Sequence, residues 1–222
     1  MLPALLESGL TRLVSSAPPS LAAFYRQNGS PEEIIKLVGL SNKRFGSVCE
    51  ELVTNLVDGK QIPDSKGRSG WDMEFTTNNT TSPFRFEIKA SRYWRSGKKS
   101  FFKWQHVLPD HEWSHLLLCA IDFDRMRLFA LSKYQFMQLV TEGKITQQGG
   151  ASGQGCWFEL KKVIDVATEL STEVDHGHGQ KSEYIMGLTN FVTANPASHD
   201  PVSQEDIATA MKLGSISRNK KK

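Results

Sequence analysis

Apolar residues recur at helical spacing through the first 60 residues of the chain. Residues 2–15 and 20–27 form two short periodic segments, and a longer helix is predicted from 42 to about 57. The apolar residues that fall near one face of this longer helix are Phe45, Cys49, Leu52 and Leu56. Asp58 and Gly59 follow as a turn signal and predict where the helix ends.

From residue 71 onward the pattern becomes typical of strands. Residues 71–77 and 84–90 flank a polar turn, so they are predicted to form an antiparallel hairpin. The nearly continuous apolar run at 116–123 is typical of a strand that is covered on both faces. Residues 126–131 are predicted to pair back on that run as a second hairpin.

The remainder of the chain mixes helical and strand signals. A helix is predicted to begin at Ser132 and to end near residue 140, and 156–160 is predicted to be another strand. Beyond residue 172 the chain is mostly polar, with helices predicted at 183–192 and 203–213.

Together these elements predict one α/β domain, a mixed β-sheet core flanked by helices, with N- and C-terminal helical additions. We assign residues 1–41 to an N-terminal helical region and residues 42–170 to the core. Residues 171–222 form a C-terminal helical region that ends in a basic tail.

Composition excludes several classes of protein. The 222 residues are 39% hydrophobic and 23% charged, as expected for a globular domain with a substantial core. No stretch approaches the roughly 20 apolar residues that cross a bilayer. The first residues lack a basic segment and carry Glu7 within their apolar run, which is unlike a secretory signal. Three widely spaced cysteines predict no disulfide framework, so we expect a cytoplasmic protein with buried thiols.

The net charge of +3 carries little information, because it depends on the basic tail. Four of the 27 basic residues lie in the last five positions, and without them 23 basic residues face 24 acidic ones. The local distribution of charge is therefore more informative than the total.

The candidate chemistry lies in the first predicted hairpin. Asp72 and Glu87 are separated by fourteen residues that contain the turn, so pairing of the two strands can bring their carboxylates together. Because side chains alternate along a strand, Glu87 and Lys89 share one face while Ile88 points to the other. Two adjacent carboxylates repel each other, and a hard divalent cation such as Mg²⁺ relieves that repulsion. A lysine beside the cation can orient a water molecule or stabilise charge on a phosphate.

This arrangement resembles the PD-(D/E)xK nuclease superfamily, which includes most type II restriction endonucleases. The matching residues are Asp72, Glu87 and Lys89, and the residue before Asp72 is Trp71 where the fuller motif has proline. The resemblance covers about residues 43–160 and implies a restriction-endonuclease-like fold. It also implies that the main-chain carbonyl of Ile88 is a metal ligand.

The same family often has a further acidic residue on the preceding helix, in a Gly-x-x-x-Glu context. Gly46 and Glu50 fit that context, so Glu50 is a candidate catalytic residue, and Glu51 competes with it for the role. A glutamate beside the apolar stripe of a helix is, alternatively, only solvated.

A basic and aromatic stretch follows the motif directly. Residues 85–103 contain seven Lys and Arg residues against one acid, Glu87, with five aromatic residues among them. Such a segment suits contact with a phosphate backbone, although its aromatic residues could equally pack on the core. The candidate DNA-binding residues are Arg68, Ser69, Arg92, Tyr93, Arg95, Lys98, Lys99, Lys103 and Gln105.

We therefore expect a Mg²⁺-dependent, sequence-specific endonuclease that cuts double-stranded DNA to 5′-phosphate and 3′-hydroxyl ends, as type II restriction enzymes do. Asp72 and Glu87 would hold the metal with the Ile88 carbonyl, Mn²⁺ would substitute for Mg²⁺, and Lys89 would position the attacking water. Cutting both strands of a symmetric site predicts a homodimer, and no membrane association is expected.

Three other interpretations remain. The chain could be a structure-selective repair, recombination or phage nuclease, or a DNA-binding module of the same fold without activity. His111, Glu112 and His115 also match the zinc-protease pattern H-E-x-x-H. That pattern needs a helix, and the strand-like run at 116–123 follows at once. His106, His111 and His115 could instead edge the DNA-facing side of a nuclease site, but we expect them to be surface histidines.

Overall fold

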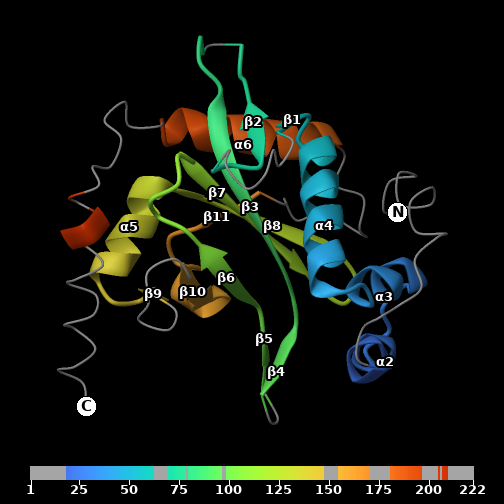
Figure 1. The fold of residues 1–222 in the computed structure, drawn as a ribbon. Helices are drawn as coiled ribbons and strands as arrows, with labels where there is room; N and C mark the ends of the chain where they lie inside the picture. Colours follow the sequence, from blue (N-terminus) through green and yellow to red (C-terminus); the bar gives the residue numbers. More distant parts are fainter. Residues whose placement is uncertain are drawn as a thin grey trace.

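A mixed six-stranded sheet organises the computed structural model of this chain (Figure 1). The structure describes residues 19–62, 70–78, 80–96, 99–147, 155–170, 181–196, 205 and 207–209. The strands of the sheet, in spatial order, are β1 (Lys60–Gln61), β2 (Met73–Phe75), β3 (Phe84–Arg92), β7 (His115–Ile121), β8 (Met126–Ser132) and β11 (Thr168–Glu169). Only β3 and β7 pair in parallel, with Phe86 opposite His115 and Arg92 opposite Ile121.

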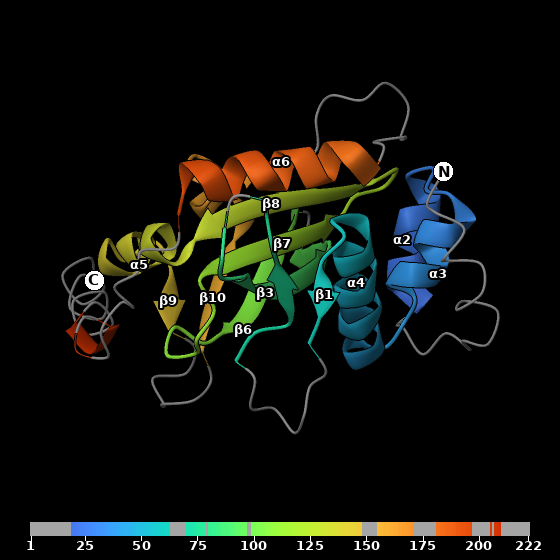
Figure 2. The same cartoon turned by 90° about the horizontal axis from the view of Figure 1, so that it is seen from above.

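The two faces of the sheet are covered by different layers. The helices that share the core on one face, here termed the helical layer, are α2 (Pro19–Gln27), α3 (Glu32–Val38), α4 (Asn42–Leu56) and α6 (Lys181–Ala194). Figure 2 shows α2, α3 and α4 at the opposite side from α5, with α6 running along β8. The other face is covered by α5 (Lys133–Thr141), by the short helix η1 (Leu160–Lys162), and by a small sheet of β6 (Lys103–Val107), β10 (Cys156–Glu159) and β9 (Thr146–Gln147).

Strand β7 is the partition between two hydrophobic cores. All seven of its residues are buried, as predicted from its continuous apolar run. Leu117 and Cys119 belong to the core under the helical layer, whereas Leu116 and Leu118 belong to the core under α5 and the small sheet. The three cysteines are also buried and free, as predicted.

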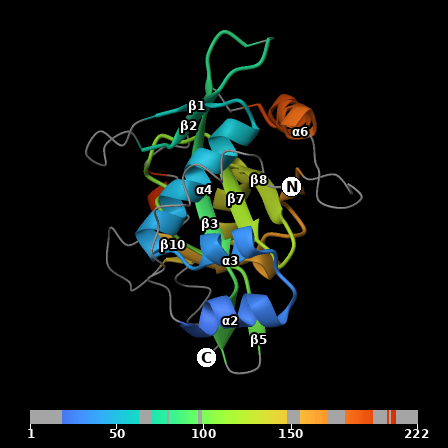
Figure 3. The same ribbon diagram turned by 90° about the vertical axis from the view of Figure 1, so that its right-hand side faces the viewer.

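Strand β3 continues beyond the sheet into a two-stranded ribbon of β4 (Trp94–Ser96) and β5 (Lys99–Phe101). The ribbon extends away from the body of the molecule (Figures 1 and 3). The polypeptide then returns through β6 before it enters β7, so the ribbon and β6 form the crossover that a parallel pair requires.

Tyr25 of α2 holds the point where β3 turns into this ribbon. Its hydroxyl donates a hydrogen bond to the Ile121 carbonyl at 2.6 Å and accepts one from the Tyr93 amide at 3.0 Å. The ring of Tyr93 stacks on Phe102 and Phe123, with centroids 4.3 and 4.7 Å away. The ends of two neighbouring strands are thereby tied to one side chain.

The predicted elements are largely confirmed, with differences at their ends. The helix predicted at 42–57 is α4, which ends before Asp58, a residue with a φ of 58°. The predicted hairpin forms, although β2 covers only three residues of the predicted segment 71–77. Ser132 caps α5 with a complete capping box, and the helix predicted at 183–192 is α6. The segments at 2–15 and most of 203–213 lie outside the described residues.

The N- and C-terminal helices are part of the main core. Tyr25, Ile34 and Leu37 from the first region and Leu188 and Phe191 from α6 are buried in the same cluster as the sheet residues. The predicted regions 1–41 and 171–222 therefore complete the α/β domain wherever they are described. No described helix combines the length and the apolar character that a membrane span needs.

His115 ties α6 to the start of β7. The imidazole is fully buried against Phe86, its Nε2 lies 2.9 Å from the Asn195 carbonyl, and its Nδ1 lies 2.9 Å from the Ser114 hydroxyl. A carbonyl only accepts hydrogen bonds, so Nε2 carries the hydrogen. Burial lowers the pKa of His115 to about 4, against a smaller opposing effect of the bond to Asn195, so the ring is neutral near pH 7.

We expect this histidine to make the protein acid-sensitive. The contribution of the neutral ring is fully present above its unfolded-state pKa of 6.5 and is lost as the pH falls towards about 4. The free energy of unfolding should therefore decrease by about 3 kcal/mol over this range from His115 alone. Urea unfolding at several pH values measures it, with His115→Gln as a variant that keeps an N–H donor but does not titrate. Titration of the His115 ring near pH 6.5 in NMR spectra would contradict this assignment.

Candidate active site

Asp72 is held in place by three hydrogen bonds at the start of β2. Its amide donates to the Phe86 carbonyl at 2.8 Å, and its carbonyl accepts from the Ile62 amide at 2.9 Å. Its carboxylate Oδ2 accepts from the Ile88 amide at 2.7 Å. The Asp72 carboxylate therefore accepts the hydrogen bond from the Ile88 amide of β3 that a backbone carbonyl would accept if β2 were longer.

Glu87 and Lys89 lie together on the opposite face of β3 from Ile88. Ile88 is fully buried under the helical layer, as the alternation of the strand predicts. Glu87 is only 6% exposed, and its Oε1 forms an ion pair with the Lys89 ammonium. The pair is therefore not a weak surface bridge, because the glutamate is inside the protein.

The electrostatics of the two carboxylates and the lysine are coupled. Burial raises the pKa of Glu87; Lys89 opposes that increase, and the nearby Asp72 carboxylate adds to it. Burial by itself would lower the pKa of Lys89, but the charges of Glu87, Asp72 and Glu50 outweigh burial and raise it. Lys89 is thus a cation at neutral pH, placed among three acidic side chains.

Glu50 of α4 faces this group, whereas Glu51 does not. Glu50 is half-buried and contributes to the pKa of Lys89, while Glu51 is exposed. The Glu50 Oε1 lies next to Gly46, 3.9 Å from where a Cβ would be on that glycine. This favours Glu50 over Glu51 as the additional acidic residue.

The available donors suit a hard cation. Asp72 and Glu87 supply carboxylate oxygens, and a third oxygen comes from the backbone. In an extended strand the N–H and C=O of one residue point to the same side, so the Ile88 carbonyl points to the edge where its amide meets Asp72. Oxygen donors of this kind match Mg²⁺ or Mn²⁺ better than zinc, which prefers sites that include Cys or His.

The set of donors is incomplete by itself. The described residues contain no group of three or more His, Cys, Asp or Glu side chains arranged to hold a metal ion. A cation at Asp72 and Glu87 would therefore need the Ile88 carbonyl and water or substrate oxygens, which is how Mg²⁺ is commonly bound.

Two of the candidate DNA-binding residues have internal roles in the structure. The Arg92 guanidinium binds the carbonyls of Val38 and Leu40 and the side chain of Asn42, and it lies over the ring of Phe45. Tyr93 is stacked in the aromatic cluster beside α2, and its hydroxyl lies 3.1 Å from Asp122. Both side chains attach β3 to neighbouring elements, because the end of α3 and the β7–β8 turn pack against them.

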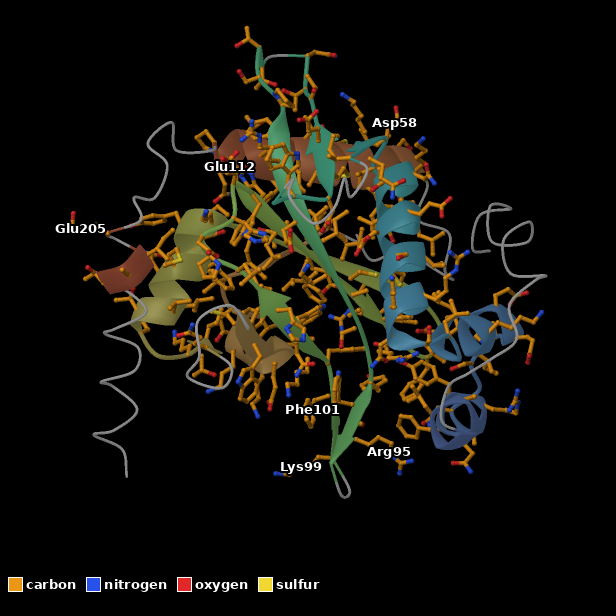
Figure 4. All side chains as sticks on the ribbon, viewed as in Figure 1. Asp58, Arg95, Lys99, Phe101, Glu112 and Glu205 are labelled. Atoms are coloured by element: carbon orange, nitrogen blue, oxygen red, sulfur yellow. The ribbon has the colours of Figure 1, made fainter. Side chains whose placement is uncertain are left out.

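The other described candidates lie on or near the ribbon. Arg95 and Lys99 are exposed towards its tip (Figure 4), and Arg95 lies over the ring of Phe24 at 4.6 Å. Lys103 lies between two indole rings, with its ammonium 5.1 Å from Trp94 and 4.4 Å from Trp157. Arg68, Ser69 and Lys98 lie outside the described residues.

A cavity of about 680 Å³ separates the ribbon base from α4. Gln105, Arg95 and Lys103 line it, together with Gly46 and Ser91. The sequence indicated the basic residues here, and His106, which has an unusual backbone φ of 60°, also lines the cavity. The sequence did not indicate Trp157, which comes from a distant strand and contacts Lys103.

The H-E-x-x-H segment does not form a zinc-protease site. Residues 111–114 are not helical, and His115 begins β7 with both ring nitrogens in hydrogen-bonding contact with protein atoms. His115 is therefore a core residue, which corrects the expectation that it lies on the surface. Glu112 instead pairs with Arg85 at 3.0 Å, and Arg85 lies over the ring of Trp71.

Two comparisons with known proteins found no protein related to this chain. A scan against models of known protein families finds no match to this chain, and a search of curated proteins finds no significant match. The geometry of the site is therefore the basis for any functional assignment.

We expect Asp72→Asn to weaken binding of Mn²⁺ at least about ten-fold, because one charged oxygen ligand is lost while the acceptor for the Ile88 amide is kept. Isothermal titration calorimetry of the folded protein measures this. Glu74→Gln, which changes an acid on the same strand that pairs with Lys60, is the matched control and should bind as the wild type does. Binding should also weaken at lower pH, since the raised pKa of Glu87 makes protons compete with the metal. Equal affinities in Asp72→Asn and the wild type would contradict the assignment.

Proposed function

We propose that this protein is a Mg²⁺-dependent DNA endonuclease of the PD-(D/E)xK type. The observation that carries the proposal is the arrangement at β2 and β3, where the Asp72 carboxylate binds the Ile88 amide beside the buried Glu87–Lys89 pair. Buried charges are costly, and repelling carboxylates are retained mainly where they have a function. The six-stranded mixed sheet is compatible with the fold that the motif implies.

Each residue has a distinct role in this proposal. Asp72, Glu87 and the Ile88 carbonyl would hold the cation, which supplies Lewis-acid stabilisation of the phosphate charge. Lys89 keeps its proton, because its pKa is raised, so its ammonium would orient the attacking water and balance charge on the phosphate. Glu50 lies on the α4 side of Lys89, where it can help to hold the ammonium or a metal-bound water.

Nucleic acid is the proposed substrate because cations gather next to this site. The ribbon carries Arg95 and Lys99, and Lys103 follows it at the start of β6. A two-stranded β-ribbon fits the major groove of B-DNA. Hydrolysis would leave 5′-phosphate and 3′-hydroxyl ends. A two-fold assembly would place one site on each strand of a symmetric DNA sequence, as proposed for a type II restriction enzyme.

A structure-selective nuclease is the second candidate. The specific observation in its favour is the cavity of about 680 Å³ beside the site, which a surface for paired DNA alone does not require.

The decisive test is incubation of the purified chain with long duplex DNA and Mg²⁺ or Mn²⁺. We expect cleavage that is abolished by EDTA and reduced at least about 100-fold by Asp72→Asn and by Lys89→Met, because each removes transition-state charge stabilisation. Glu74→Gln should cut as the wild type does. Discrete fragments would identify a sequence-specific enzyme, and a smear or selective cutting of branched DNA would identify a structure-selective one. Absence of cleavage on paired, mismatched and branched DNA, together with DNA binding, would identify an inactive binding module.

A further inference from the structure

Three parts of the chain form most of the cavity beside the ribbon, and Leu21 of α2 and Leu40 also line it. Residues of α4 form one wall, the junction of β3 with the ribbon forms the second, and β6 forms the third. Its volume of about 680 Å³ is within the ~300–1,000 Å³ range of small-molecule sites. Among its described lining residues are three cations, Arg92, Arg95 and Lys103, and no aspartate or glutamate.

The cavity adjoins the candidate active site along two of its three elements, β3 and α4. Ala90 and Ser91, which follow Lys89 on β3, line it. Gly46, one turn before Glu50 on α4, lines it as well. A DNA strand with one phosphate at Lys89 would therefore place an adjacent nucleotide at the cavity.

An aromatic and cationic wall faces this space. Trp94 is 42% exposed, which is unusual for a large apolar side chain, and it lines the cavity. The Lys103 ammonium lies near the rings of both Trp94 and Trp157, so both indoles are in contact with this cation. Aromatic faces beside cations are the surfaces on which proteins stack unpaired bases while they bind the backbone.

A β-bulge shapes the third wall. The pairing of β6 with β10 shifts register, so that two residues, Gln105 and His106, lie opposite Trp157 alone. His106 has a φ of 60°, and Gly155 packs so closely that a Cβ there would lie 2.8 Å from the Val107 carbonyl. Such strain persists where neighbouring structure enforces it, often next to functional sites. Here it brings the polar residues Gln105 and His106 to the cavity.

We propose that this cavity binds one unpaired nucleotide of the DNA strand, with its base against Trp94 and its phosphate near Arg95 and Lys103. Bases inside a duplex are stacked on each other and offer no free face, whereas an extrahelical base offers both. The inference rests on the proposed nuclease function. Within that function it favours the structure-selective candidate, because it names the preferred substrate as DNA with an unpaired nucleotide.

Binding without cleavage tests the proposal. Fluorescence anisotropy in EDTA would compare a fully paired duplex with the same duplex carrying one extra, unpaired nucleotide. We expect the wild type to bind the second DNA about ten-fold more tightly, because one base–indole stack is gained. Trp94→Ala should remove this preference while binding of the paired duplex changes little. Tyr134→Ala, which removes an aromatic residue that is 61% exposed on α5, should keep the preference.

The role of the cations is tested in the same assay. Arg95→Gln should weaken binding of both DNAs and reduce the salt dependence of affinity, since one phosphate contact is lost. Lys144→Gln, which changes an exposed lysine after α5, is the charge-matched control. Unchanged thermal unfolding of Trp94→Ala and Arg95→Gln would show that the fold is retained.

The outcomes separate this proposal from the proposed nuclease function. Equal affinity of the wild type for the two DNAs, or a preference that survives Trp94→Ala, would overturn the cavity assignment even if the enzyme cuts DNA. A Trp94-dependent preference in a protein that cuts none of the DNAs would support the assignment and refute the nuclease.

Discussion

The parallel pairing of β3 with β7 is the constraint on which the rest of the structure depends. Parallel neighbours must run in the same direction, so the chain has to return from the end of β3 to the start of β7. Here the return is made by the β4–β5 ribbon and by β6. The ribbon, one side of the cavity and the basic residues beside the candidate site are therefore parts of one crossover, which begins after Arg92, three residues beyond Lys89.

The same pairing explains why the charges at the site are buried. Glu87 and Lys89 lie on β3 between β7 on one side and Asp72 on the other, and water is excluded from most of the glutamate. In the absence of a cation, two carboxylates repel each other and one lysine compensates for them only in part. The site is thus less stable by itself than an apolar arrangement would be, as is common where catalytic groups are held ready for a ligand.

The sequence predicted those helices and strands whose formation depends on residues that are close together in the chain. The apolar stripe of α4, the capping box at Ser132 and the double burial of β7 each follow from residues close together in the chain. The juxtaposition of Asp72 with Glu87 could also be predicted, because one hairpin connects them. The internal role of Arg92 could not, since its partners lie on α3 and α4, about fifty residues earlier. The bulge at His106 likewise depends on a partner strand that is distant in sequence.

The Tyr25 hydroxyl, which binds both the Ile121 carbonyl and the Tyr93 amide, has a consequence for how such a protein can evolve. The orientation of the ribbon is set at its base by Tyr25 of α2, and the two hydrogen bonds of that link involve no described residue of β4 or β5. In the proposed nuclease, substitutions towards the tip would therefore alter which nucleic acid is recognised while the alignment of the carboxylates stays unchanged. Selection would then act on specificity and on chemistry as two separable traits of one fold.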